Sequence, residues 1–453
     1  MRLMRTGSFL ALALTAGLLT TGFILPARSA SDPLKAAREA LNRKDYDSAL
    51  ERLDAIIKTS PGEASAYELR AVVQSYRGRP EEALADFDRL IGLGTGRDRP
   101  DLLRRISLGL LADLLSHDQE VVRGAAVTAL AELGPSDARP PLIGAFGDPS
   151  PRVRSLAIQT AGRLGWAASI PSVRNAVGDP EASVRIAALS ALGLSKDPTA
   201  VPLVRRGLTD QDPIAQLVAH EALVRLTQAQ PVRPLLEAAR DFSPAVRGAA
   251  MGILGRLKEP SALPVLTMGL HDPDGSVRSF AAGALGDLGN PSAIPALMEA
   301  LSDEDPYARN FAAASLGRLK ARVAVSALWG VVKDSDAHVR VAAAEALIRL
   351  GEGEAALVLR GLLKDPDFGV RSAAVGAIAR TAPARATAFA LEVFDDPAPR
   401  VRVAAVQALG RIGGKTALPY LRRALLDKDP TVRAFSAGHL GSLTAGRNRK
   451  TED

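Results

Sequence analysis

The sequence predicts an all-α solenoid, a stack of helix–turn–helix units, for most of the chain. An arginine returns every 31 residues, an aspartate precedes it by six, and apolar residues after it fall on one helix face. A fixed period of this size indicates a repeat array rather than a single closed core. Gln216 occupies one of the arginine positions, so the frame covers eleven copies. The frame arginines are Arg123, Arg154, Arg185, Arg247, Arg278, Arg309, Arg340, Arg371, Arg402 and Arg433.

Residues 1–30 have the pattern of a secretory signal peptide. Two arginines precede an apolar run over residues 9–25, and small residues follow at positions 26–30. Such a segment is removed during export. We therefore expect cleavage after Ser29 and a periplasmic or secreted protein. The alternative is an uncleaved inner-membrane anchor, because the run is near the lower length limit for a membrane span.

Residues 31–96 follow a different period, in which Ala49-Leu50 returns 34 residues later as Ala83-Leu84. This spacing and these residues resemble the tetratricopeptide repeat, a helix–turn–helix unit, over about two copies. The resemblance implies a groove for a peptide or a partner helix. Two units are few for a groove, so a role as the end cap of the array is the alternative.

Residues 100–445 hold the eleven copies, each predicted to contain a short first helix, a turn and a longer second helix. In the copy around Arg278, the helices are expected at about 261–270 and 273–288. The aspartate six residues before the frame position is expected to cap the second helix, because its carboxylate can accept from free backbone N–H groups. Five glycines stand where the second helix should end in a left-handed residue. They are Gly134, Gly165, Gly289, Gly351 and Gly413.

A helical wheel places the frame arginine at the rim of the buried arc of the second helix. The arc is formed by the preceding valine, the alanine three residues later and the leucine seven residues later, as in Val277, Ala281 and Leu285. The arginine's own aspartate lies on another side of the helix, so the aspartate of a neighbouring unit is the better partner. We expect stacked Arg–Asp pairs that fix the rotation between units. The alternative is a row of exposed binding charges.

The aspartate, the Val-Arg pair, the alanine and a proline in six first helices together resemble HEAT repeats, in particular the short variety of bilin lyases. The six prolines are Pro140, Pro171, Pro202, Pro264, Pro295 and Pro419. The resemblance implies an armadillo-like superhelix with an Asp–Arg ladder between units and with second helices lining the concave side. It implies no particular chemistry.

The candidate binding residues are the arginines nine positions after the frame, on the exposed side of the second helix. We name them the arginine column, and it could bind an acidic protein partner. The alternative is that these cations only suit helix C-termini and a soluble surface. The column comprises Arg163, Arg225, Arg256, Arg318, Arg349, Arg380 and Arg411.

No residues of the chain form a recognisable catalytic or metal site. The chain has no cysteine, and its five histidines fall at different frame positions. His220-Glu221 resembles a single His-Glu pair of deoxyhypusine hydroxylase, a HEAT-like di-iron enzyme that needs several. We therefore expect no enzyme activity, cofactor or metal. A di-iron or bilin-lyase-like protein is the alternative.

Charge gives no support for nucleic-acid binding. The formal net charge of +7 falls to about +4 without the signal peptide, which removes three arginines and no acid. A nucleic-acid binder would show a concentrated basic surface.

Two copies depart from the pattern. Gln216 replaces a frame arginine, and Pro231 and Pro234 follow in the next first helix, which predicts a local change of curvature. The last copy has Ser436 and His439 at usually apolar positions, which is typical of a capping repeat with a hydrated outer face. Residues 446–453 read as a charged tail.

These observations predict a right-handed superhelix on the order of 100 Å long, given helix spacings of about 8–10 Å. We expect a monomeric, non-enzymatic scaffold of the bacterial cell envelope that binds a protein partner along its concave face. It would contact the membrane only if residues 1–30 stay attached.

Overall fold

The computed structural model describes residues 34–94, 99–166, 170–227 and 232–449. Every regular element within these ranges is a helix, so the predicted all-α solenoid is confirmed. No described helix combines the length and the apolar character needed to cross a membrane. The predicted signal peptide and residues 450–453 lie outside the described residues.

The described part of the chain begins with two helical hairpins that pack side by side, and α3 also packs on the first long helix that follows. Their helices are α1 (Lys35–Asn42), α2 (Tyr46–Thr59), α3 (Ala64–Tyr76) and α4 (Pro80–Gly92). The tetratricopeptide resemblance of this part stays a prediction.

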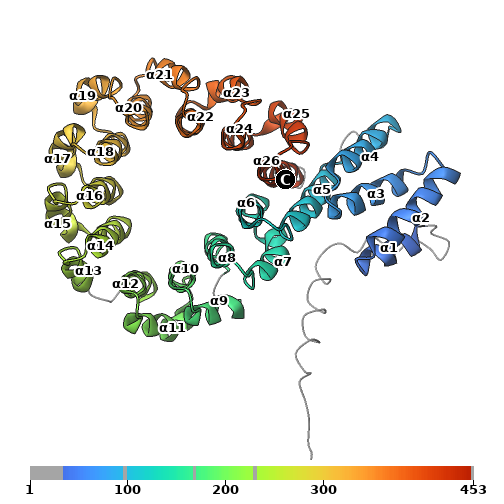
Figure 1. Ribbon diagram of the computed structural model, residues 1–453, viewed down its shortest axis with the longest axis horizontal. Helices are drawn as coiled ribbons and strands as arrows, with labels where there is room; N and C mark the ends of the chain where they lie inside the picture. Colours follow the sequence, from blue (N-terminus) through green and yellow to red (C-terminus); the bar gives the residue numbers. More distant parts are fainter. Residues whose placement is uncertain (1–33, 95–98, 167–169, 228–231, 450–453) are drawn as a thin grey trace, which may run out of the picture.

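The array has two layers, and its second helices form the inner one (Figure 1). The array starts with α5 (Pro100–Leu114). The inner helices are α6 (Glu120–Leu130), α8 (Pro151–Arg163), α10 (Ala182–Leu194), α12 (Pro213–Thr227), α14 (Pro244–Leu257), α16 (Gly275–Leu288), α18 (Pro306–Arg318), α20 (Ala337–Arg349), α22 (Phe368–Thr381), α24 (Pro399–Ile412) and α26 (Pro430–Arg449).

The outer helices are shorter, and several are extended at one end by a single 3₁₀ turn. They are α7 (Pro135–Ala145), α9 (Pro171–Asn175), α11 (Val201–Arg206), α13 (Arg233–Ala238), α15 (Leu263–Gly269), α17 (Ile294–Glu299), α19 (Val325–Val331), α21 (Ala355–Leu362), α23 (Pro383–Glu392) and α25 (Gly414–Ala424). The core between the layers is largely alanine, leucine and valine, and this allows the helices to approach closely.

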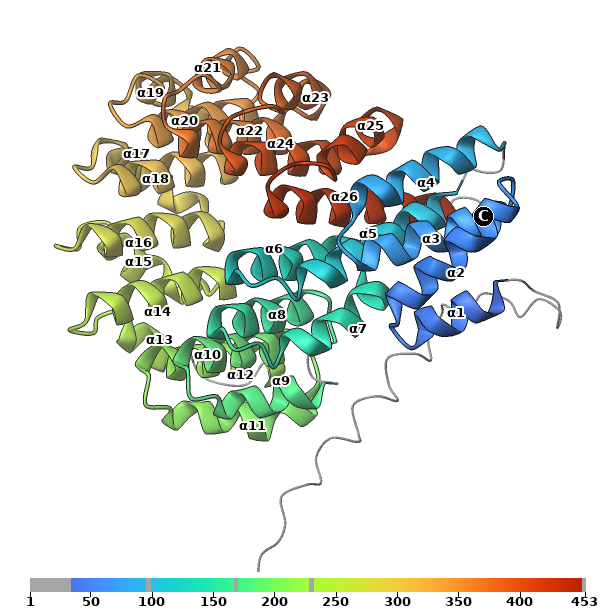
Figure 2. The same ribbon diagram turned by 45° about the vertical axis from the view of Figure 1, so that its right-hand side comes forward.

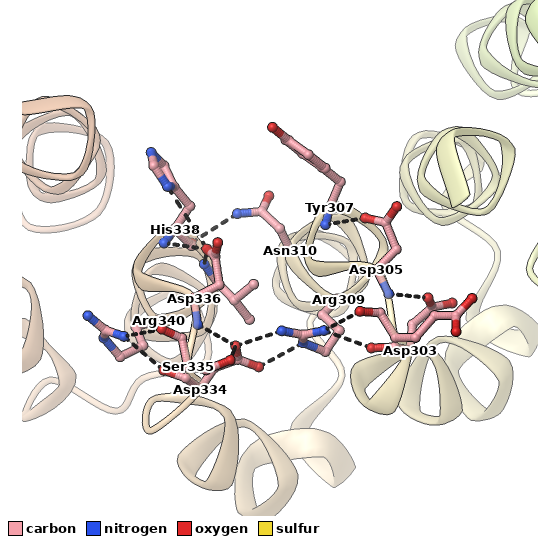
Figure 3. Close-up of polar contacts among 12 residues, drawn as sticks. Asp303, Asp305, Tyr307, Arg309, Asn310, Asp334, Ser335, Asp336, His338 and Arg340 are labelled. Carbon is pink, nitrogen blue, oxygen red and sulfur yellow. Dashed lines mark hydrogen bonds and ion pairs between the residues drawn. The ribbon is translucent and has the colours of Figure 1, made fainter. Parts of the chain in front are cut away.

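The frame arginines join successive units, as the sequence predicts. Arg309 donates from Nε and Nη2 to the two carboxylate oxygens of Asp334 in the next unit, at 2.8 Å each. Its Nη1 donates to the backbone carbonyl oxygens of Asp303 and Glu304 in its own turn, at 2.8 and 3.1 Å (Figure 3). We call this series the ladder. Its other bidentate pairs are Arg123–Asp148, Arg154–Asp179, Arg185–Asp210, Arg247–Asp272, Arg278–Asp303, Arg371–Asp396 and Arg402–Asp427.

The expectation that the ladder aspartate caps the second helix is wrong by two residues. Asp303 accepts from the backbone N–H of Asp305 and so forms a turn just before the helix. Asp305 is the cap, because its carboxylate accepts from the N–H of Tyr307 at 2.7 Å. The ladder aspartate stays outside the helix because its carboxylate also faces the arginine of the preceding unit. The acid two positions after the ladder aspartate is the cap in other units as well, as at Asp274 and Asp367.

The five glycines predicted at the ends of second helices all have positive φ. Three other units place a lysine at the same frame position in the left-handed region, with φ between 54° and 56°, namely Lys196, Lys258 and Lys320. Lysine is not a residue typical of a left-handed helix end, so these three positions could not be predicted from residue type.

The ladder is interrupted at Gln216. Its amide donates to the carbonyl oxygen of Asp210 at 2.6 Å, as the arginines do within their own turn, but it is too short to pair with Asp241. The packing between α12 and α14 is less extensive than that between α14 and α16. The line of inner helices also turns between α12 and α14, where the sequence predicts a change of curvature (Figure 1). Pro231 lies outside the described residues, and Pro234 lies in the first turn of α13.

Replacing Gln216 with arginine is expected to stabilise the protein by about 1 kcal/mol. The new guanidinium would reach Asp241 and supply the missing pair. Thermal unfolding of Gln216→Arg and of Gln216→Lys, which adds the charge without the bidentate geometry, measures the gain. Equal melting temperatures for the two variants would contradict the prediction.

The array closes into a ring, so its last unit is not the exposed end that the sequence predicts (Figure 1). Helix α26 packs against α5 and α6 at the other end of the array, and Figure 2 shows it beside α5. We call this contact the seam. A Cβ atom on Gly438 would lie 2.5 Å from the carbonyl oxygen of Ala129, so the two backbones are in close contact. Arg422 of α25 also pairs with Asp88 of α4.

The prediction that Ser436 and His439 form a hydrated cap is therefore wrong. Ser436 is fully buried and His439 is 4% exposed, because α5 and α6 cover α26. The ladder also ends in the seam. Arg433 has no following unit and lies near Asp113 of α5. Burial raises the pKa of the Asp113 carboxyl, and Arg433 offsets part of that rise.

The buried imidazole makes the seam sensitive to acid. Burial lowers the pKa of His439, and Arg411 lowers it further, whereas Glu132, with an oxygen 3.7 Å from Nδ1, raises it. Because the pKa of His439 is lower in the folded state than in the unfolded state, the neutral imidazole contributes fully to stability above the unfolded-state pKa of about 6.5. This contribution is lost as the pH falls through the folded-state pKa.

The melting temperature is expected to fall more between about pH 8 and about pH 5.5 in the wild type than in His439→Gln, which cannot take up a proton. An equal fall in both proteins would contradict this prediction.

Candidate partner-binding face

The arginine column lies on the inner helices, near their C-terminal ends, and four of its members are drawn together by two glutamates. Glu221 accepts from Arg225 of its own helix at 2.9 Å and from Arg256 of the next unit at 2.8 Å. Glu345 likewise accepts from Arg349 at 2.8 Å. Its second partner is Arg380 of the next unit, at 2.7 Å. The column is thus partly neutralised by two acids, of which the sequence analysis considered Glu221 only as part of a His-Glu pair and did not identify Glu345.

The remaining three arginines are not paired with these two glutamates. Arg163 donates to the hydroxyl of Thr160 at 3.3 Å. Arg318 donates to the hydroxyl of Ser315 at 2.7 Å and to the carbonyl oxygen of Gly283 at 3.1 Å. Arg411 is exposed at the surface of α24. The arginine column therefore does not act as a uniform row of charges, and its use in binding stays a prediction.

Three members of the column meet in one hollow of about 360 Å³ between α18, α20 and α22. We call it the arginine pocket. It is lined by Arg318, Arg349 and Arg380 around Glu345, with Asn310 and His338 at the other end. Asn310 donates to the carbonyl oxygen of His338 at 2.9 Å, which ties α18 to α20 beside the hollow (Figure 3).

Glu345 stays charged within the arginine pocket. Burial acts to raise the pKa of its carboxyl, but hydrogen bonds from Arg380 and Arg349 outweigh burial and leave the pKa below its ordinary value. The pKa of Arg380 is raised in turn by its hydrogen bonds with Glu345. The carboxylate therefore holds two guanidinium groups at fixed positions on the inner face.

Helices α16 and α18 carry three exposed aromatic side chains that sequence reasoning missed, Phe280 on α16 and Tyr307 and Phe311 on α18, which borders the arginine pocket. We call them the aromatic patch. The ring of Phe280 lies over Gly248 of α14, and that of Phe311 lies against Gly283 of α16, where no Cβ atoms intervene. Even so, Phe280 is 52% exposed and Phe311 is 42% exposed. Phenylalanine stands two residues after the frame arginine in three copies, at Phe280, Phe311 and Phe435, and this recurrence could have signalled the patch.

Comparison with family models decides the family. The model for HEAT repeats matches residues 108–185, 170–241, 232–310, 294–379 and 356–441. The chain belongs to the HEAT-repeat family. A comparison with curated proteins finds no match.

Several solved structures are similar to this HEAT-repeat protein. Human deoxyhypusine hydroxylase in complex with glycerol is 24% identical, with 55% of this chain and 98% of that chain covered and a TM-score of 0.31. The complex of CpcE and CpcF of phycocyanin lyase from Nostoc is 23% identical, with coverages of 56% and 94% and a TM-score of 0.33. A Kap121p mutant is 15% identical, with coverages of 89% and 48% and a TM-score of 0.29. TM-scores this low carry no argument about activity.

The His-Glu pair of this HEAT-repeat protein is not arranged like a metal site. Glu221 faces Arg225 and Arg256, and burial lowers the pKa of His220. Within the described ranges, no three histidine, aspartate or glutamate side chains gather closely enough to hold a metal ion.

Proposed function

We propose that the protein is a non-enzymatic scaffold of the bacterial cell envelope and that a protein partner binds along the inner face of the ring. The observation that carries the proposal is the aromatic patch beside the arginine pocket. Exposed aromatic rings on neighbouring helices that also carry arginines are typical of protein interfaces, because both residue types are enriched there. Export is supported by the pattern of residues 1–30.

Affinity purification from envelope extracts tests the binding proposal. The variant Arg256→Glu, Arg318→Glu, Arg349→Glu reverses charge on the inner face. The matched control reverses three exposed arginines of the outer layer, Arg205, Arg206 and Arg240. We expect the first variant to lose a protein that the wild type and the control both retain. An identical set of bound proteins in all three samples would remove the proposal.

Two further measurements test the remaining parts of the proposal. Mass spectrometry of the exported protein should find Ala30 as the first residue, if cleavage follows Ser29. Metal analysis and a visible absorption spectrum should show neither iron nor a chromophore. Either one, bound in stoichiometric amount, would favour a di-iron or bilin-lyase-like protein instead.

A further inference from the structure

The arginine pocket differs from the rest of the arginine column in its balance of charge. Three guanidinium groups line one hollow, and Glu345 is the one carboxylate among the residues that line it. Asp287 lies 3.5 Å from Arg318 but is almost half exposed to solvent, so it offsets little of that charge. The hollow therefore keeps an excess of positive charge on an otherwise small-residue surface.

The guanidinium groups also keep donors for a second acceptor. Each has five N–H donors. Glu345 accepts one bond from Arg349 and two from Arg380. Because the carboxylate fixes both side chains, little side-chain entropy would be lost when a further anion binds. A planar carboxylate fits such donors in a bidentate manner.

Two residues of the aromatic patch, Tyr307 and Phe311, lie on α18, the helix that also supplies Asn310 and Arg318 to this hollow. Phe311 and Arg318 lie on the same side of α18, seven residues and therefore about two turns apart. Tyr307 points to the same side as Asn310 and His338, away from the ladder (Figure 3). A ligand that covers both surfaces must present apolar groups next to an anion.

We propose that the arginine pocket binds a carboxylate side chain of an extended acidic segment in the protein partner, and that neighbouring apolar side chains of the segment lie on the aromatic patch. This inference rests on the proposed function and names the part of the partner that the inner face recognises. Glu345 competes with the incoming carboxylate and sets its affinity.

A fluorescently labelled peptide of alternating glutamate and leucine, compared with its glutamine–leucine counterpart, tests the pocket by fluorescence anisotropy. The wild-type protein is expected to prefer the glutamate peptide. The variant Arg318→Gln, Arg349→Gln should weaken binding of that peptide about tenfold or more, because it removes charge-assisted hydrogen bonds. Arg411→Gln is the matched control, since it removes the same charge from the same column outside the pocket.

Glu345→Gln gives the sharper result. It removes the competing carboxylate, so the affinity for the glutamate peptide should rise several-fold. A purely structural Glu345 would give lower stability and no gain in affinity. Circular dichroism verifies folding of each variant, and Arg318→Gln, at an exposed side chain, provides the answer if Glu345→Gln does not fold.

Three results would overturn the inference. They are equal affinity of the wild type for both peptides, equal weakening by Arg411→Gln and by the pocket variant, and no gain in a folded Glu345→Gln protein. The proposed function is tested separately from the pocket. If the charge-reversed inner face loses the partner in envelope extracts while Arg318→Gln, Arg349→Gln retains it, the scaffold proposal stands and the pocket inference does not.

Discussion

Replacing Arg309 with alanine is expected to lower the free energy of unfolding by about 3 kcal/mol, because it breaks a largely buried, hydrogen-bonded ion pair. The side chains of Arg309 and Asp334 are 14% and 11% exposed. Without the guanidinium, the carboxylate of Asp334 keeps only donors from its own turn, such as the N–H of Asp336, and two carbonyl oxygens of the preceding turn lose the arginine donor. Stability in a repeat array depends on contacts between neighbours, so the damage should centre on the units joined by α18 and α20. Chemical denaturation and hydrogen exchange measure both effects.

A double-mutant cycle separates the pair from its surroundings. Asp334→Ala and the double variant complete the cycle, and we expect a coupling energy of more than about 1 kcal/mol between the two sites. Arg309→Lys is the matched control, because it keeps the charge but cannot make the bidentate pair. If the Arg309→Lys variant were as stable as the wild type, charge alone, rather than bidentate geometry, would join the units.

The second large effect is expected at the seam, where replacing Gly438 with valine should open the ring. The new side chain would meet the backbone of Ala129, which cannot move away without shifting α6. Overpacking of this kind destabilises by about 1–3 kcal/mol. Here it acts at one contact, the one between α26 and α6 that joins the two ends of the array. Small-angle X-ray scattering should show a larger radius of gyration, with helix content unchanged by circular dichroism.

Gly252→Val is the matched control for the seam. Gly252 lies inside α14, and an added Cβ atom would meet only Nη1 of Arg256, at 3.5 Å. The control should therefore keep the scattering curve of the wild type. If Gly438→Val gives the same curve as Gly252→Val, closure does not depend on the close approach of α26 to α6.

The sequence was sufficient to predict the repeating unit, because the unit is set by local interactions. The 31-residue period, the glycines at the ends of second helices and the pairing of Arg309 with the next aspartate all follow from residues that recur at fixed spacing. Closure of the ring could not be predicted, because it depends on small rotations summed over all the units. The polar residues Ser436 and His439 therefore suggested an exposed end, although they lie under α5 and α6.

The candidate site was predicted only in part. The seven arginines of the column were identified as a class. However, Glu221 and Glu345 occupy a frame position that is otherwise mostly small, so averaging over the copies concealed them. Phe280 and Phe311 were missed for the same reason. Binding surfaces of repeat proteins are built from the departures from the repeat, and a consensus of the copies removes those departures.

The seam restricts how the number of units can change. In an open array, one unit can be gained or lost and the rest of the molecule simply becomes longer or shorter. In a closed ring, the rotations of all units must sum to one full turn, so a missing unit leaves α26 short of α5 and an extra one makes them collide. The number of units in this molecule is therefore restricted, and new binding properties are expected to arise from substitutions within units rather than from added or lost units. Packing between α12 and α14, beside Gln216, is less extensive than between other neighbouring inner helices, so we expect substitutions to be tolerated best there.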